Sequence, residues 1–122
     1  MATGTVNINR DSAAGKRLGQ LMPAGTGTNT LYTVPKRYRT QLTLLVISCN
    51  ANASYSIFHD EAGTSYTNST NLRNLVALTA GNFHEMTFGN GAWVRNPGTI
   101  GVQSSVANAF TFTLYGLEDF LT

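Results

Sequence analysis

The chain is 122 residues long, carries one cysteine, and has 11% charged residues with a net charge of +2. This length is sufficient for one domain with its own core, and a single cysteine excludes an internal disulfide framework. The charge is too small for a dedicated nucleic-acid-binding protein, and no segment approaches the roughly 20 apolar residues of a membrane span. We therefore expect neither nucleic acid nor a membrane as partner, and the polar N-terminus predicts no secretion signal.

The first third of the chain predicts an arm followed by two short strands. Residues 1–15 are small and polar without a sustained period, so we expect an extended N-terminal arm ahead of a β-sandwich domain at 16–122. Residues 16–23 are expected to form an edge strand that ends at a proline. Residues 30–34 predict a second strand, which also stops at a proline because proline cannot donate to a ladder of hydrogen bonds.

Residues 41–50 give the strongest strand prediction, because apolar side chains occupy both sets of alternating positions. In a regular strand they would divide into two groups, with Leu42, Leu44 and Val46 on one face and Leu45 and Ile47 on the other. Two apolar faces indicate a central strand, or a strand that a partner subunit covers on its outer side.

The rest of the chain continues as short strands separated by turn signals and by a polar loop at 59–71. We expect these strands at 54–58, 72–79, 83–88, 93–94, 100–102 and 110–115, with turns at 80–82, 89–91 and 96–98. A helical turn is the alternative at 72–79. Eight or nine strands at this spacing predict an all-β fold, an antiparallel β-sandwich of jelly-roll type. A small closed barrel and an immunoglobulin-like sandwich are the alternatives, although the cysteine pair of true immunoglobulin domains is absent.

The sequence offers little reactive chemistry. His59, Asp60 and Glu61 are adjacent in a predicted loop, where neighbouring side chains rarely converge on one ion, so we expect a solvated turn and keep a metal site as the alternative. His84 and Glu85 are expected on opposite faces of a strand. The chain has no Gly-x-Ser-x-Gly turn, phosphate loop or dinucleotide motif. We therefore expect no enzyme, no cofactor and no metal, and a buried thiol at Cys49.

Positive charges are unevenly distributed, with the acidic pair Glu118 and Asp119 at the other end of the chain. Such polarity can orient a protein on an acidic partner, and solvated loop charge is the alternative. The basic residues in the two N-terminal groups are Arg10, Lys16, Arg17, Lys36, Arg37 and Arg39.

Aromatic residues expected at the surface are candidates for an interface anchor or for stacking on a sugar. Trp93 is the best anchor, and the alternative is that it closes the end of the core. The further candidates are Tyr32, Tyr38, Tyr66 and Tyr115. A carbohydrate-binding module would use Trp93 and Tyr66 as its stacking platforms.

Four segments carry a resemblance to a known group of proteins: GKRLGQLMPAG at 15–25, LYTVP at 31–35, LVISCN at 45–50 and FTFTLYGLE at 110–118. With these segments the chain resembles small virion structural proteins of tailed bacteriophages, from about residue 16 to residue 118. The resemblance implies a β-sandwich that coats or extends a phage particle and needs no catalytic residue. It implies a capsid decoration (cement) protein, commonly trimeric, which binds the major capsid protein on the virion surface after synthesis in the bacterial cytoplasm.

Two departures leave the position on the virion open. The region 59–72 is shorter than in those proteins, and the basic segment 36–39 replaces their Ala-Gly-Thr turn. A tail, baseplate or fibre component that contacts tail proteins is therefore an alternative, and a carbohydrate-binding module is the alternative of another class. The candidate contact residues for the capsid or for other subunits are Arg10, Lys16, Arg17, Tyr32, Lys36, Arg37, Arg39 and Trp93.

Overall fold

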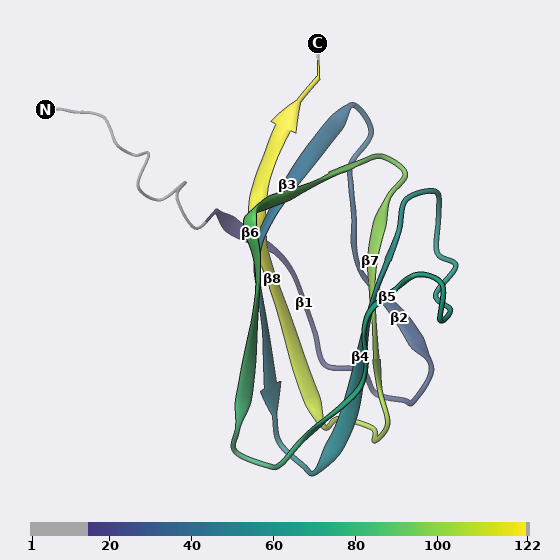
Figure 1. Cartoon of the computed structure of the whole chain (residues 1–122), viewed down its shortest axis with the longest axis vertical. Coiled ribbons are helices and arrows are strands. Elements are labelled where there is room, and N and C mark those ends of the chain that lie inside the picture. Colours follow the sequence, from purple (N-terminus) through teal and green to yellow (C-terminus); the bar gives the residue numbers. More distant parts are fainter. Residues whose placement is uncertain (1–14, 122) are drawn as a thin grey trace, which may run out of the picture.

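The computed structural model describes residues 15–121, which form two packed four-stranded sheets (Figure 1). The predicted arm at 1–15, apart from Gly15, lies outside the described residues, and so does Arg10. One sheet contains β1 (Lys16–Leu21), β3 (Tyr38–Cys49), β6 (Phe83–Arg95) and β8 (Phe110–Phe120). The other contains β2 (Thr28–Thr33), β4 (Ala53–Asp60), β5 (Asn71–Leu78) and β7 (Thr99–Ser104).

The strand orders identify the topology as a jelly roll. They are β1-β8-β3-β6 and β2-β7-β4-β5, and every pair of neighbouring strands is antiparallel. The first four strands therefore pair with the last four in reverse order, as in a long hairpin folded into two layers. This arrangement confirms the predicted jelly-roll sandwich and excludes the barrel and the immunoglobulin-like alternatives.

The structure corrects the expected face assignment of β3. Its pairing with β8 shifts register between Leu42 and Leu44, so Thr43 is an extra residue, a β-bulge. The bulge moves Leu42 to the inner face, where it is buried together with Leu45 and Ile47. Leu44 and Val46 are left half-buried on the outer face. Sequence alternation alone could not locate the extra residue.

The structure also joins two predicted strands into one. The segments 83–88 and 93–94 both belong to β6, although a turn was expected between them. Leu42 pairs with Ala92 and Leu44 pairs with Thr87. Four residues of β6, 88–91, therefore lie opposite the single residue Thr43 and form a large bulge. Gly89 adopts a positive φ of 62°, which glycine tolerates without steric cost. The long strand β3 can therefore pair with both halves of β6.

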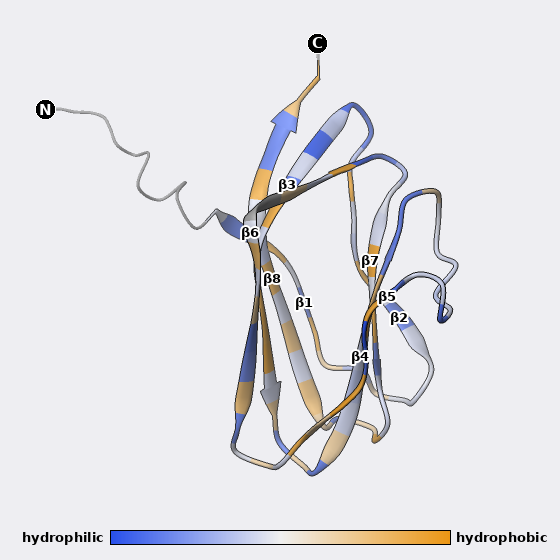
Figure 2. Ribbon diagram, viewed as in Figure 1, coloured by the Kyte–Doolittle hydropathy of each residue, from blue (hydrophilic) through white to orange (hydrophobic). Residues whose placement is uncertain are grey.

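The core between the sheets centres on three aromatic rings. Tyr55, Phe110 and Phe112 are fully buried and in mutual contact, with Tyr55 edge-on to the other two at centroid distances of 5.4 and 6.1 Å. The Tyr55 hydroxyl bonds to His84 Nδ1 at 2.8 Å and accepts from Arg73 at 2.9 Å, so this buried polar atom is satisfied. His84 therefore faces inward and the exposed Glu85 outward, as the alternation predicts. Alternating apolar and polar residues along β8 are visible in Figure 2.

A loop of the chain covers part of the outer face of the β2-β7-β4-β5 sheet. Tyr66 lies in the segment between β4 and β5, at the right of Figure 1, and packs against Phe58 at a ring distance of 5.6 Å. Its hydroxyl bonds to Thr30 and donates to Thr99, each at 2.8 Å. A Cβ at Gly101 would meet the Tyr66 ring at 2.5 Å, so glycine makes the room for this ring. Tyr66 is therefore a structural cover and not a free aromatic platform.

Gly101→Ala should displace Tyr66 and loosen the 61–70 segment, because the new methyl group overlaps the ring. We expect the free energy of unfolding to fall by about 1–3 kcal/mol in urea titrations, with faster proteolytic cleavage in this segment. Gly25→Ala is the matched control, since a Cβ there meets no atom within 4 Å. Equal effects of the two substitutions would contradict the role given to Tyr66.

Candidate binding surface

The outer side of the β1-β8-β3-β6 sheet, called here the open face, carries apolar side chains. Phe83 and Trp93 on β6 are 61% and 49% exposed, which is unusual for residues of this size. Half-buried apolar residues lie beside them on the central strands. These are Leu44 and Val46 on β3 and Tyr115 and Leu117 on β8.

Strand register places these residues in adjacent rows across the open face. Gln41 pairs with Trp93 on one side and with Leu117 on the other, and Leu44 pairs with Thr87 and Tyr115. Because paired strands fix every side chain at its position, the open face is a rigid surface of mixed apolar and threonine character. The opposite outer face differs in that Tyr66 covers part of it, and its groove is lined by serine, threonine and glutamine together with the exposed Leu75.

One end of the open face is organised by Arg39. Its guanidinium lies 4.2 Å from the centre of the Trp93 ring and donates two hydrogen bonds to Asp119 Oδ2, at 3.0 and 2.9 Å. The carboxylate offsets the charge of Arg39, and the stacking holds the indole at the surface. Trp93 therefore lies on the surface, and the alternative that it closes the end of the core is wrong.

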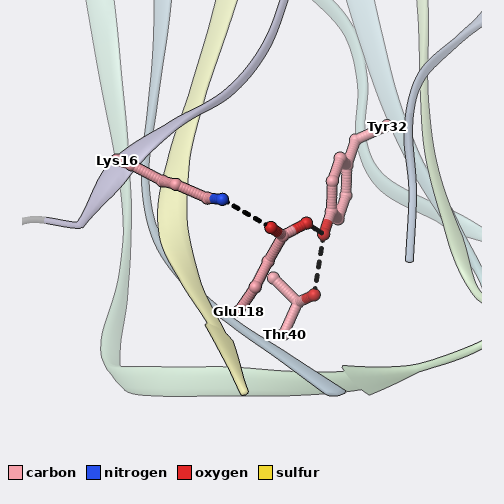
Figure 3. Close-up of polar contacts among 4 residues, drawn as sticks. All are labelled: Lys16, Tyr32, Thr40 and Glu118. Atoms are coloured by element: carbon pink, nitrogen blue, oxygen red, sulfur yellow. Dashed lines mark hydrogen bonds and ion pairs between the residues drawn. The ribbon is translucent and has the colours of Figure 1, made fainter. Parts of the chain in front are cut away.

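A second polar cluster connects the two sheets at the same end (Figure 3). Glu118 on β8 forms an ion pair with Lys16 at 2.6 Å and accepts a hydrogen bond from the Tyr32 hydroxyl at 2.5 Å. Tyr32 lies on β2 in the other sheet, and its oxygen also bonds to Thr40 on β3 at 2.8 Å. Tyr32 is only 8% exposed, so the expectation of an exposed aromatic ring at this position is wrong.

Two pKa shifts follow from this cluster. Burial, together with the hydrogen bond to Glu118, raises the pKa of Tyr32, so its phenol stays protonated and donates. Burial alone would raise the pKa of Glu118, but the hydrogen bonds from Lys16 and Tyr32 bring it below its ordinary value. The ion pair and the hydrogen bonds of this cluster link the two sheets, and they keep the cluster's side chains in fixed positions.

Several of the basic residues lie at or near the end of the sandwich that carries both polar clusters. Lys36 and Arg37 are exposed in the turn between β2 and β3, and Arg37 O accepts a hydrogen bond from Leu121 N after β8. Arg17 is exposed on β1, where it donates to Gln20. Arg95, which sequence reasoning missed, pairs with Arg39 across β6 and β3. The signal in the sequence that could have identified Arg95 is its position at the end of a predicted strand, just before a turn that contains proline.

The adjacent residues His59, Asp60 and Glu61 do not converge on one point. Asp60 accepts hydrogen bonds from the backbone of Ser65 and Ala62, which lower its pKa and organise the loop after β4. His59 and Glu61 line a cavity of about 210 Å³. Among residues 15–121, no group of three or more His, Cys, Asp or Glu is placed to hold a metal ion. Cys49 is buried, as expected, and its thiol donates to Ala51 O.

Comparison of the sequence with known protein families found no match, and comparison with curated proteins found none. Within the described part of the chain, no helix has the length and hydropathy that crossing a membrane requires.

The lowered pKa of Glu118 predicts a pH-dependent contribution to stability. Because the folded-state pKa lies below the unfolded-state value, this contribution is complete above about pH 5 and is lost as the pH falls through the folded-state pKa. Glu118→Gln should therefore lower the free energy of unfolding at pH 7, and the difference from the unmodified protein should shrink towards pH 3. Urea titrations at the two pH values measure it.

Glu85→Gln is the control for this experiment, since Glu85 lies at an exposed position of β6. It should change stability by less than about 0.5 kcal/mol at either pH. A Glu118→Gln effect that stays constant or grows towards pH 3 would contradict the assigned hydrogen bonds.

Proposed function

We propose that the protein is a structural component of a tailed-bacteriophage virion, and specifically a capsid decoration protein that binds and stabilises the outer capsid surface. The observation that carries the proposal is the open face, a rigid sheet surface with large apolar side chains left at the surface. Adhesion of this kind needs area and shape complementarity rather than reactive groups. The resemblance in sequence supports the same role.

The size of the open face fits an adhesive role. Four strands about 4.8 Å apart, along the 12 residues of β3, span roughly 700 Å². A stable protein–protein contact buries about 800 Å² on each partner. Trp93 and Tyr115 belong to the residue types enriched where binding energy concentrates. The face is therefore large enough to form most of one specific contact.

The basic end supports the proposed orientation on the particle. Exposed Lys36 and Arg37 lie beside the end of the open face marked by Arg39. Such a patch attracts an acidic surface and raises the rate of encounter, while the apolar residues supply contact area. A trimer, the expected oligomer, would present three copies of this surface and strengthen binding without any new contact.

The proposal predicts binding to undecorated, expanded capsids of the phage that encodes the chain, measured by co-sedimentation. The double substitution Phe83→Glu/Trp93→Glu should weaken binding at least tenfold, because it places charge in the apolar contact. Lys36→Glu/Arg37→Glu should weaken it most at low salt, where unscreened charge acts over the longest distance.

Leu75→Glu is the matched control, since Leu75 is 66% exposed but lies on β5 in the other sheet. It should bind capsids as the unmodified protein does. Failure of the unmodified protein to sediment with capsids even at low salt would contradict the proposal, and binding to isolated tails instead would assign it to the tail.

A further inference from the structure

The cavity beside Trp93 lies between the ends of two strands from different sheets. His59 at the end of β4 and Glu61 just after it form one wall, and the last residues of β6 with Asn96 form the other. Its volume is about 210 Å³, below the 300–1,000 Å³ typical of drug-sized ligands. The space therefore suits one small ring and excludes a long chain.

The His59 imidazole leaves a polar atom without a partner at this cavity. Its Nε2 is buried and has no hydrogen-bond partner, although buried polar atoms in proteins are nearly always paired. Along β4, Tyr55, Ile57 and His59 share the inward direction, and Tyr55 and Ile57 are fully buried. His59 lines the cavity, but its Nε2 is shielded from solvent, so the imidazole has to turn before a ligand hydroxyl can pair with this nitrogen.

The other walls of the cavity supply both hydrogen-bond donors and hydrogen-bond acceptors. Arg95 donates and the Glu61 carboxylate accepts, and their formal charges cancel. Asn96 already donates through its amide nitrogen to Val34 O at 2.8 Å, so its amide oxygen is the atom that can accept from a ligand. Trp93 also lines the cavity, and Arg39 covers one face of its indole, which leaves the other face for a ligand. An anion would be repelled by Glu61 and a metal cation by Arg95.

We propose that this cavity binds one ring of a neutral carbohydrate. Sugar hydroxyls donate and accept, as the wall groups require, and the apolar face of a sugar ring packs on an indole. Because Arg39 and Asp119 hold Trp93 in place, the aromatic wall is formed before binding. This inference does not depend on the capsid proposal, since it uses the cavity between the strand ends, which shares only Trp93 with the residues named for the open face.

The test is an NMR titration of the full-length protein with the methyl glycosides of glucose, galactose, mannose and N-acetylglucosamine, each up to about 10 mM, which is well above a Kd of about 1 mM. At least one of them should shift the indole N–H of Trp93 and the backbone amides of Arg95 and Asn96. Glucuronate, the anionic probe, should bind at least tenfold more weakly.

Arg95→Ala and Glu61→Ala should each weaken the affinity at least tenfold, and both residues are exposed, so the variants should fold. Lys36→Ala is the control, because Lys36 is an exposed cation that does not line the cavity. Three results would overturn the proposal: no shift with any of the four glycosides, tighter binding of glucuronate, or shifts that persist unchanged in both cavity variants.

Discussion

The bulge at Thr43 is the constraint on which the rest of the structure depends. β3 is a central strand, paired with β8 on one side and β6 on the other, and both registers shift between Leu42 and Leu44. Side chains in a strand alternate with a period of two, so one extra residue reverses the direction of all that follow. Leu42 therefore joins the core, and Leu44 and Val46 point away from it.

This reversal places Leu44 and Val46 on the outer face of the β1-β8-β3-β6 sheet. The β2-β7-β4-β5 sheet is partly covered by its own chain through Tyr66, and it combines a mainly polar groove with the exposed Leu72 and Leu75 of β5. The β1-β8-β3-β6 sheet keeps its apolar residues in the open. Glu118, Lys16 and Tyr32 connect the sheets beside the basic end, where Arg39 holds Trp93 at the surface. Contacts within the domain therefore hold these side chains in place, and the open face stays available for binding.

The sequence predicts the local structure better than the long-range contacts. Alternation and turn residues were sufficient for the jelly-roll sandwich and for the placement of His84 and Glu85 on opposite faces of a strand. The burial of Tyr32 depends on Glu118, which lies 86 positions later in the chain, and no local pattern encodes that contact. The cavity next to Trp93 likewise needs β4 and β6 from different sheets. The bulge was missed because it is defined by pairing with a neighbour, not by residue type.

The claim that the open face is the surface with which this protein binds is tested most directly by electron cryomicroscopy of the phage particle to which we propose that it belongs. The account predicts that Leu44, Val46 and Trp93 are buried in that map against a neighbouring protein subunit. A map in which these side chains face solvent, while the β2-β7-β4-β5 sheet makes the contact, would contradict it.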